Sequence, residues 1–81
     1  PVAEAYMLIQ TEVGRAEVVA KQIAGLPGVL SSEYVTGPYD VVARVGAENL
    51  ASLRADVVAS VQAVEGITRT LTCPIASTAG E

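Results

Sequence analysis

Two strand-forming runs meet at a turn in the stretch Tyr34-Val35-Thr36-Gly37-Pro38-Tyr39-Asp40-Val41-Val42-Ala43-Arg44-Val45. A Gly-Pro pair favours a turn, because glycine tolerates positive φ and proline fixes its own φ. We therefore predict a β-hairpin in which a very short turn joins strands at 29–36 and 39–45. Tyr39 and Asp40 place a phenol and a carboxylate where the chain reverses, so the turn concentrates the chain's chemistry.

The segment before this hairpin predicts a strand and a helix. Residues 5–11 predict a first strand, and its apolar residues are continuous rather than alternating, as in a strand that is covered on both faces. Gly14 then opens a helix with apolar residues at helical spacing on one side only. The segment Gly25-Leu26-Pro27-Gly28 ends that helix, because proline cannot continue it and glycine permits a left-handed exit.

The segment after the hairpin predicts a second helix and a last strand. Gly46 and Ala47 are expected to leave the sheet, and Asn49 to cap the helix. The last strand, at 67–73, alternates and places Thr68, Thr70 and Thr72 on one face. The core stripe of the helix is expected to be Leu50, Leu53, Val57, Val61 and Val64.

A weak internal repeat divides the chain into two halves. The spacing Ile23-x-x-Leu26-x-Gly28-Val29 recurs as Val61-x-x-Val64-x-Gly66-Ile67, and each copy marks a helix that turns into a strand. Two βαβ units joined by a hairpin predict an α+β, ferredoxin-like βαββαβ fold with an antiparallel four-stranded sheet and both helices on one face. We expect one domain over 1–76 and a flexible tail over 77–81.

The composition predicts oligomerisation. A core built from 81 residues, 51% of them apolar, rarely supplies more than about 3–5 kcal/mol by itself. Cys73 is single and expected to be buried, and His is absent, so neither a disulfide within the chain nor a zinc site can supplement that core. Strands one to three carry apolar residues toward the bare sheet face, which predicts a homodimer with two sheets packed face to face, a dimeric α/β barrel.

Charge and hydropathy exclude two classes of partner. No apolar run approaches the roughly 20 residues of a membrane helix, and no secretory leader opens the sequence. Five basic residues against nine acidic ones, scattered along the chain, offer no patch for a phosphate backbone. We expect a cytoplasmic protein that binds neither membranes nor nucleic acid directly.

Three motifs together resemble the effector-binding (RAM) domain of the Lrp/AsnC family, over about residues 3–76. They are Leu-Pro-Gly-Val at 26–29, Val-Thr-Gly-Pro-Tyr-Asp-Val at 35–41 and Ile-Thr-Arg-Thr-Leu-Thr at 67–72. The resemblance implies an amino-acid sensor without catalytic residues, metal or cofactor. It further implies dimers that assemble into a higher oligomer, an octamer or similar ring, and bind amino acids where dimers meet.

The resemblance also implies the site residues. Gly37, Tyr39 and Asp40 match the family's turn motif, and Thr70 and Thr72 match its last-strand threonines. We expect Asp40 to hold the ligand's ammonium group. A proline at the position of Pro38 departs from the polar or acidic residues common there, and it removes one backbone donor.

The sequence also differs from full-length family members in its domain organisation. Full-length family members carry an N-terminal helix-turn-helix domain, and none precedes Ala3, so we expect a stand-alone effector domain. Its partners would then include full-length Lrp/AsnC regulators.

Other interpretations remain open. An ACT-type regulatory domain shares the strand order and binds amino acids between helices and sheet, and a purely structural partner of full-length regulators would bind no ligand. Asp40 could simply bond its own turn, and the threonines could reflect strand propensity. An enzyme that uses Pro1 as a catalytic amine is disfavoured, because the first strand begins after that residue and no basic residues converge on it.

Overall fold

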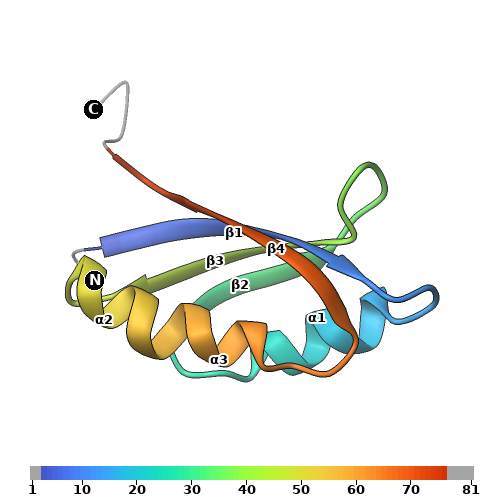
Figure 1. The fold of residues 1–81 in the computed structure, drawn as a ribbon, viewed down its shortest axis with the longest axis horizontal. Coiled ribbons are helices and arrows are strands. Elements are labelled where there is room, and N and C mark those ends of the chain that lie inside the picture. The colour runs from blue at the N-terminus through green and yellow to red at the C-terminus, as the bar shows by residue number, and fades with distance from the viewer. Residues whose placement is uncertain (1–2, 77–81) are drawn as a thin grey trace.

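The computed structural model describes residues 3–76 and contains a four-stranded antiparallel sheet in the order β2-β3-β1-β4 (Figure 1). This order and the two helical segments confirm the predicted α+β, ferredoxin-like fold. Pro1 and the predicted tail at 77–81 lie outside the described residues. The elements are β1 (Ala3–Thr11), α1 (Ala16–Ala24), β2 (Val29–Tyr34), β3 (Val41–Ala47), α2 (Leu50–Ser52), η1 (Leu53–Val58), α3 (Ala59–Gln62) and β4 (Ile67–Pro74).

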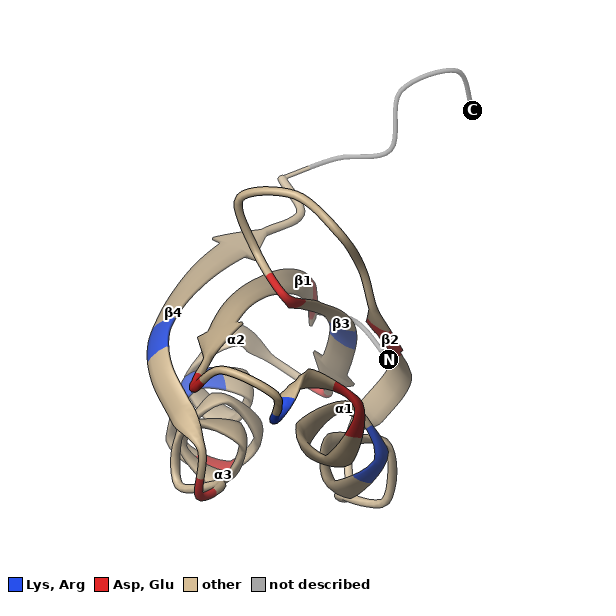
Figure 2. Ribbon diagram, turned by 90° about the vertical axis from the view of Figure 1, so that its right-hand side faces the viewer, with Lys and Arg blue, Asp and Glu red and all other residues tan. Residues whose placement is uncertain are grey.

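The core lies between one face of the sheet and the helices. Figures 1 and 2 show both helical segments side by side on that face, as the repeat predicts. The residues of the two central strands, β1 and β3, that face the helices pair with one another across the ladder. Met7 and Ala43 are one such pair, and both are fully buried. The buried residues are Ala5, Met7, Ile9, Val19, Ala20, Ile23, Val41, Ala43, Val45, Leu53, Val57, Val58 and Val61.

The second helix runs without a break through α2, η1 and α3, and its middle segment is π-helical. Asn49 caps it as predicted, because its Oδ1 accepts a hydrogen bond of 2.7 Å from the N–H of Ser52. Val57 and Val58 of this segment are both buried, although only Val57 belongs to the predicted core stripe. Leu50 is 44% exposed, so its assignment to the core was wrong.

Gly28 and Gly66 each pack against the helix of the opposite half of the chain. Both have positive φ, +86° and +99°, which favours glycine. A Cβ at Gly28 would lie 2.5 Å from Cγ2 of Val57, and one at Gly66 would lie 3.2 Å from Cγ2 of Val19. The same number of residues separates Val19 from Val57 as separates the two glycines, so the contacts are equivalent in the internal repeat.

The connection between β2 and β3 is longer than predicted. The strands end at Tyr34 and begin again at Val41, and the N–H of Val35 donates to the carbonyl oxygen of Asp40 at 2.8 Å to close a loop over 35–40. Pro38 has no N–H for a ladder, and Gly37 has φ +141°, so neither extends a strand. The predicted very short turn was therefore wrong. The prediction that Gly46 and Ala47 leave the sheet was also wrong, because both pair with β1.

The sheet face away from the helices, called the open face below, is partly apolar. Tyr6 and Leu8 of β1 pair with Cys73 and Leu71 of β4, and Leu8 also pairs with Val42 of β3. On β2, Ser31 and Glu33 pair with open-face residues of β3, so the second strand presents polar residues at these two positions. Cys73 is exposed here, so its predicted burial was wrong as well. Within residues 3–76, no helix is long and apolar enough to span a membrane.

Replacing Gly28 by alanine should destabilise the protein far more than the same change at Gly14. Both glycines have positive φ, but the space around the Gly14 position is empty, whereas the new Cβ at 28 would overlap Val57. We expect Gly14→Ala to cost about 1–2 kcal/mol of unfolding free energy and Gly28→Ala about 2–5 kcal/mol, because overpacking is added to the backbone term. Urea unfolding of the two variants measures the difference, and equal losses would contradict the packing argument.

Candidate functional site

The loop over 35–40 is bonded to the end of β1, and we call it the docked loop. Asp40 provides two of the contacts: its N–H donates to the carbonyl oxygen of Ile9 at 2.9 Å, and its Oδ2 accepts from the N–H of Thr11 at 2.8 Å. The hydroxyl of Thr11 lies 3.4 Å from the same carboxylate oxygen. Gln10 adds a third contact, from Nε2 to the carbonyl oxygen of Pro38 at 3.0 Å. The loop is thus held by three consecutive residues of β1.

The docked loop keeps polar groups that can meet a ligand. Within residues 3–76, both side-chain hydrogen bonds of Asp40 end on Oδ2, so Oδ1 is available as an acceptor. Among the same residues, the N–H groups of Gly37 and Tyr39 donate no hydrogen bond. A carboxylate oxygen suits an ammonium group, and two free N–H donors suit a carboxylate. One short loop therefore offers the two kinds of partner that a zwitterion needs.

The structure does not bring Thr70 and Thr72 to this loop. They pair with the buried residues Ile9 and Met7, which places them on the helix-covered face of β4. Since β1 lies between β3 and β4, about 10 Å of sheet separates β3 from β4. Thr70 is also engaged, because its Oγ1 accepts a hydrogen bond of 3.0 Å from Nε2 of Gln62. In one chain, only Gly37, Tyr39 and Asp40 of the predicted site residues lie together.

Sequence reasoning missed the residues of β1 that hold the loop. Gln10 and Thr11 follow a continuous apolar run at 5–9, and this change to polar residues is the signal that could have identified them. A strand end with free donors is a place where a neighbouring loop can bind.

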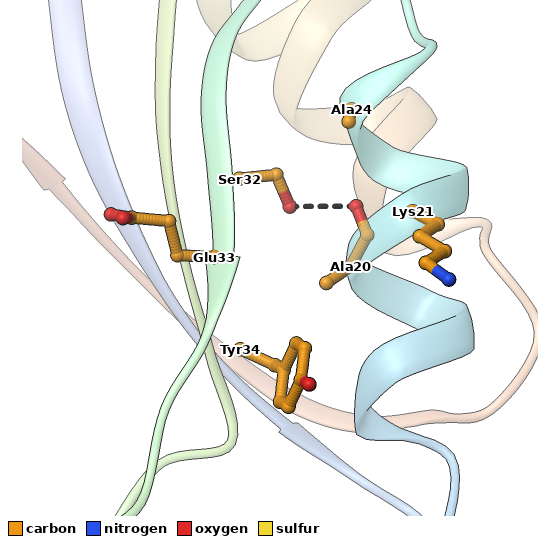
Figure 3. Close-up of a pocket in the computed structure, with 6 residues that line it drawn as sticks. All are labelled: Ala20, Lys21, Ala24, Ser32, Glu33 and Tyr34. Carbon is orange, nitrogen blue, oxygen red and sulfur yellow. Dashed lines mark hydrogen bonds between the residues drawn. The ribbon is translucent and has the colours of Figure 1, made fainter.

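A groove of about 330 Å³ between α1 and β2 was also missed (Figure 3). Two of its polar side chains already have partners. Oγ of Ser32 donates to the carbonyl oxygen of Ala20 at 2.8 Å, and Lys21 forms an ion pair with Glu17 at 3.1 Å. Figure 3 shows Glu33 extending from the other side of β2. Small side chains and one aromatic ring therefore form most of the wall. The lining residues are Ala20, Lys21, Ala24, Ser32, Glu33 and Tyr34.

Charged residues are dispersed over the described part of the chain. Figure 2 shows Lys and Arg on separate elements, without a continuous basic surface among residues 3–76. Arg44 on the open face donates from Nε to Oε1 of Glu4 at 2.8 Å, and Nη2 contacts the same oxygen. This hydrogen bond to Glu4 raises the pKa of Arg44, so the guanidinium stays charged. In the same residues, no three His, Cys, Asp or Glu side chains gather as metal ligands would.

A family model covers nearly the whole chain. The family model described as the Lrp/AsnC ligand binding domain matches residues 4–80. The structure of TTHA0845 from Thermus thermophilus is 33% identical, with 94% of this chain and 95% of that chain covered and a TM-score of 0.84. No curated protein matches the sequence.

Two more distant structures show the same fold. Hypothetical protein PHS023 from Pyrococcus horikoshii is 22% identical over 95% of this chain and 93% of that chain, with a TM-score of 0.83. E. coli AsnC is 17% identical over 95% of this chain, with a TM-score of 0.83. This chain spans about half of AsnC, since only 52% of that chain is covered.

Removing the Asp40 carboxylate should loosen the docked loop. Asp40→Ala deletes the acceptor for the N–H of Thr11, and a hydrogen bond to a charged group contributes about 1.5–3 kcal/mol. Asp40→Asn keeps a side-chain oxygen for that N–H, so its loss should be clearly smaller. Chemical denaturation of both variants measures the unfolding free energies. If Asp40→Ala were as stable as the wild type, the loop would not depend on this contact.

Proposed function

Because the chain belongs to the Lrp/AsnC ligand-binding domain family, we propose that it is an amino-acid-sensing module of transcription regulation whose ligand binds at the docked loop. The observation that carries the proposal is that, within residues 3–76, Oδ1 of Asp40 accepts no hydrogen bond and the N–H groups of Gly37 and Tyr39 donate none. An α-amino acid presents an ammonium and a carboxylate on one carbon, which matches this close pairing of opposite partners.

Each group of the loop has a role in this proposal. Oδ1 of Asp40 accepts from the ligand's ammonium, while Oδ2 keeps the loop on Thr11. The N–H groups of Gly37 and Tyr39 donate to the ligand's carboxylate. Pro38 between them offers only its carbonyl oxygen, which Gln10 already binds. The carboxylate is therefore held by fewer backbone donors than a loop without proline would provide.

Thr70 and Thr72 enter the site in this proposal only through a second copy of the chain. Within one chain β1 separates them from Asp40. A ligand that touches both the docked loop and these threonines must therefore lie between copies. This agrees with a binding site at contacts between dimers, as the family resemblance implies.

The open face supports a homodimer as the unit of that assembly. Tyr6 is 44% exposed and Leu71 38% exposed in the single chain, and Leu8 of β1 pairs with Leu71 on one side and with Val42 on the other. Packing two such faces together removes this apolar surface from water. We further propose that dimers join into a higher ring, that amino-acid binding between dimers shifts the assembly equilibrium, and that full-length Lrp/AsnC regulators are partners in it.

A screen of the twenty amino acids by thermal shift tests the sensor function. A ligand at about 100 times its dissociation constant should stabilise the wild type by roughly 2.7 kcal/mol. Asp40→Asn should lose this stabilisation while remaining folded, because its oxygen can still bind Thr11 and only the charge for the ammonium is gone. Glu48→Gln, which changes an exposed carboxylate outside the loop, should respond as the wild type does.

Two results would contradict the proposal. If no amino acid stabilised the wild type, the purely structural partner would be the better interpretation. If a ligand stabilised Asp40→Asn and the wild type equally, the ligand would bind elsewhere, and the groove between α1 and β2 would then favour the ACT-type interpretation.

The thiol of Cys73 reports on the proposed dimer. It is exposed in the single chain and lies on the open face opposite Tyr6. In the native protein we expect slow reaction with a disulfide reagent and at least twice the monomer mass by light scattering. Leu71→Arg buries a charge in the interface and should give a fast-reacting monomer. A native protein that reacts as quickly as this variant would not use the open face.

A further inference from the structure

Arg69 of β4 lies on the open face, at the end of the sheet that holds the docked loop. It pairs with Gln10 of β1 and precedes Leu71 by two residues, so its side chain shares the face of Leu71. Gln10 in turn donates to the carbonyl oxygen of Pro38 in the docked loop. Figure 1 shows this loop rising on the side of the sheet away from the helices. The apolar part of the open face thus ends in two polar residues next to the loop.

Asp40 and Arg69 lie on opposite sides of Gln10. The ladder between β1 and β3 ends at the pair Ile9 and Val41, so its next step places Gln10 beside Asp40. Neighbouring strands are about 4.8 Å apart, so roughly 10 Å separates the backbone of Asp40 from that of Arg69. A ligand bound at Asp40 and a long arginine side chain that reaches toward it can span this distance together.

Arg69 is also a cation without an acidic partner in the described part of the chain. Within residues 3–76, Lys21 and Arg44 each form an ion pair, whereas Arg69 forms none. Two other arginines of this range have no ion pair, but Arg15 lies at the start of α1 and Arg54 in η1, on the helix side of the sheet. Of these three arginines, Arg69 alone shares the open face with Gln10.

We propose that Arg69 makes the docked loop selective for an acidic amino acid, glutamate or aspartate, an inference that rests on the sensor function proposed above. The ligand's ammonium lies on Asp40 and its α-carboxylate on the N–H groups of the loop. The side-chain carboxylate then lies on the guanidinium fork of Arg69, which matches its two oxygens. Without this cation, the second carboxylate would face the negative charge of Asp40 with no partner of its own.

Calorimetry with glutamate and with its amide, glutamine, tests the selection. The wild type should bind glutamate at least about tenfold more tightly, because only the acid forms a fully charged pair with the guanidinium. Arg69→Gln should lose this preference: its affinity for glutamate should fall by about tenfold, while its affinity for glutamine stays within roughly twofold. Lys21→Gln is the control, because it removes the same charge from the exposed side of α1, and it should keep the preference of the wild type.

The ratio of the two affinities separates selection from a structural role. If Arg69 only paired with a carboxylate of a second copy, Arg69→Gln would change the assembly mass or weaken both ligands alike, and the unchanged ratio would overturn the proposal. Equal binding of glutamate and glutamine by the wild type would also overturn it, but would leave the sensor function standing. If no amino acid bound to the wild type, the sensor function and the selection would both be wrong.

Discussion

The fold depends on two equivalent close contacts, in each of which a glycine of one half of the chain packs against the helix of the other half. Gly28 lies against Val57 in the second half, and Gly66 lies against Val19 in the first, with no room for a side chain at Gly28. Each contact fixes the loop that leads from a helix into the next strand. Right-handed crossovers place both helices on the same face of the sheet, and these contacts hold each helix against the loop of the opposite half. The open face is a consequence of that arrangement.

Asp40 links this scaffold to the proposed site. One carboxylate oxygen accepts from the backbone of Thr11, so the charge helps to define the position of the loop. The other oxygen is the group proposed to bind a ligand. A site built this way is already ordered before the ligand arrives, which lowers the entropic cost of binding. Stability and recognition are therefore linked, because Asp40, the residue proposed to bind the ligand, also holds the docked loop.

The sequence predicted most of the fold because its decisive features are local. The two glycine motifs, the Asn49 cap and the apolar periodicity each act within a few residues, and together they give the strand order. Features that depend on distant partners were missed. Asp40 bonds Thr11 across 29 residues, and the π-helical geometry of Leu53–Val58 was not predicted. Cys73 is exposed because of the face on which it lies, which residue type does not determine.

The proposed dimer accounts for the presence of a charged pair, Glu4 and Arg44, within the partly apolar open face. A purely apolar sheet face could pack against a partner in several registers, since side chains along a strand repeat every second residue. The Glu4–Arg44 pair, adjacent to Tyr6 in the ladder, breaks that equivalence. A partner face that shifted by one step would place apolar side chains on a charged pair and leave it without water. In the proposed dimer, the pair therefore contributes to the choice of register more than to affinity, as charged groups at interfaces commonly do.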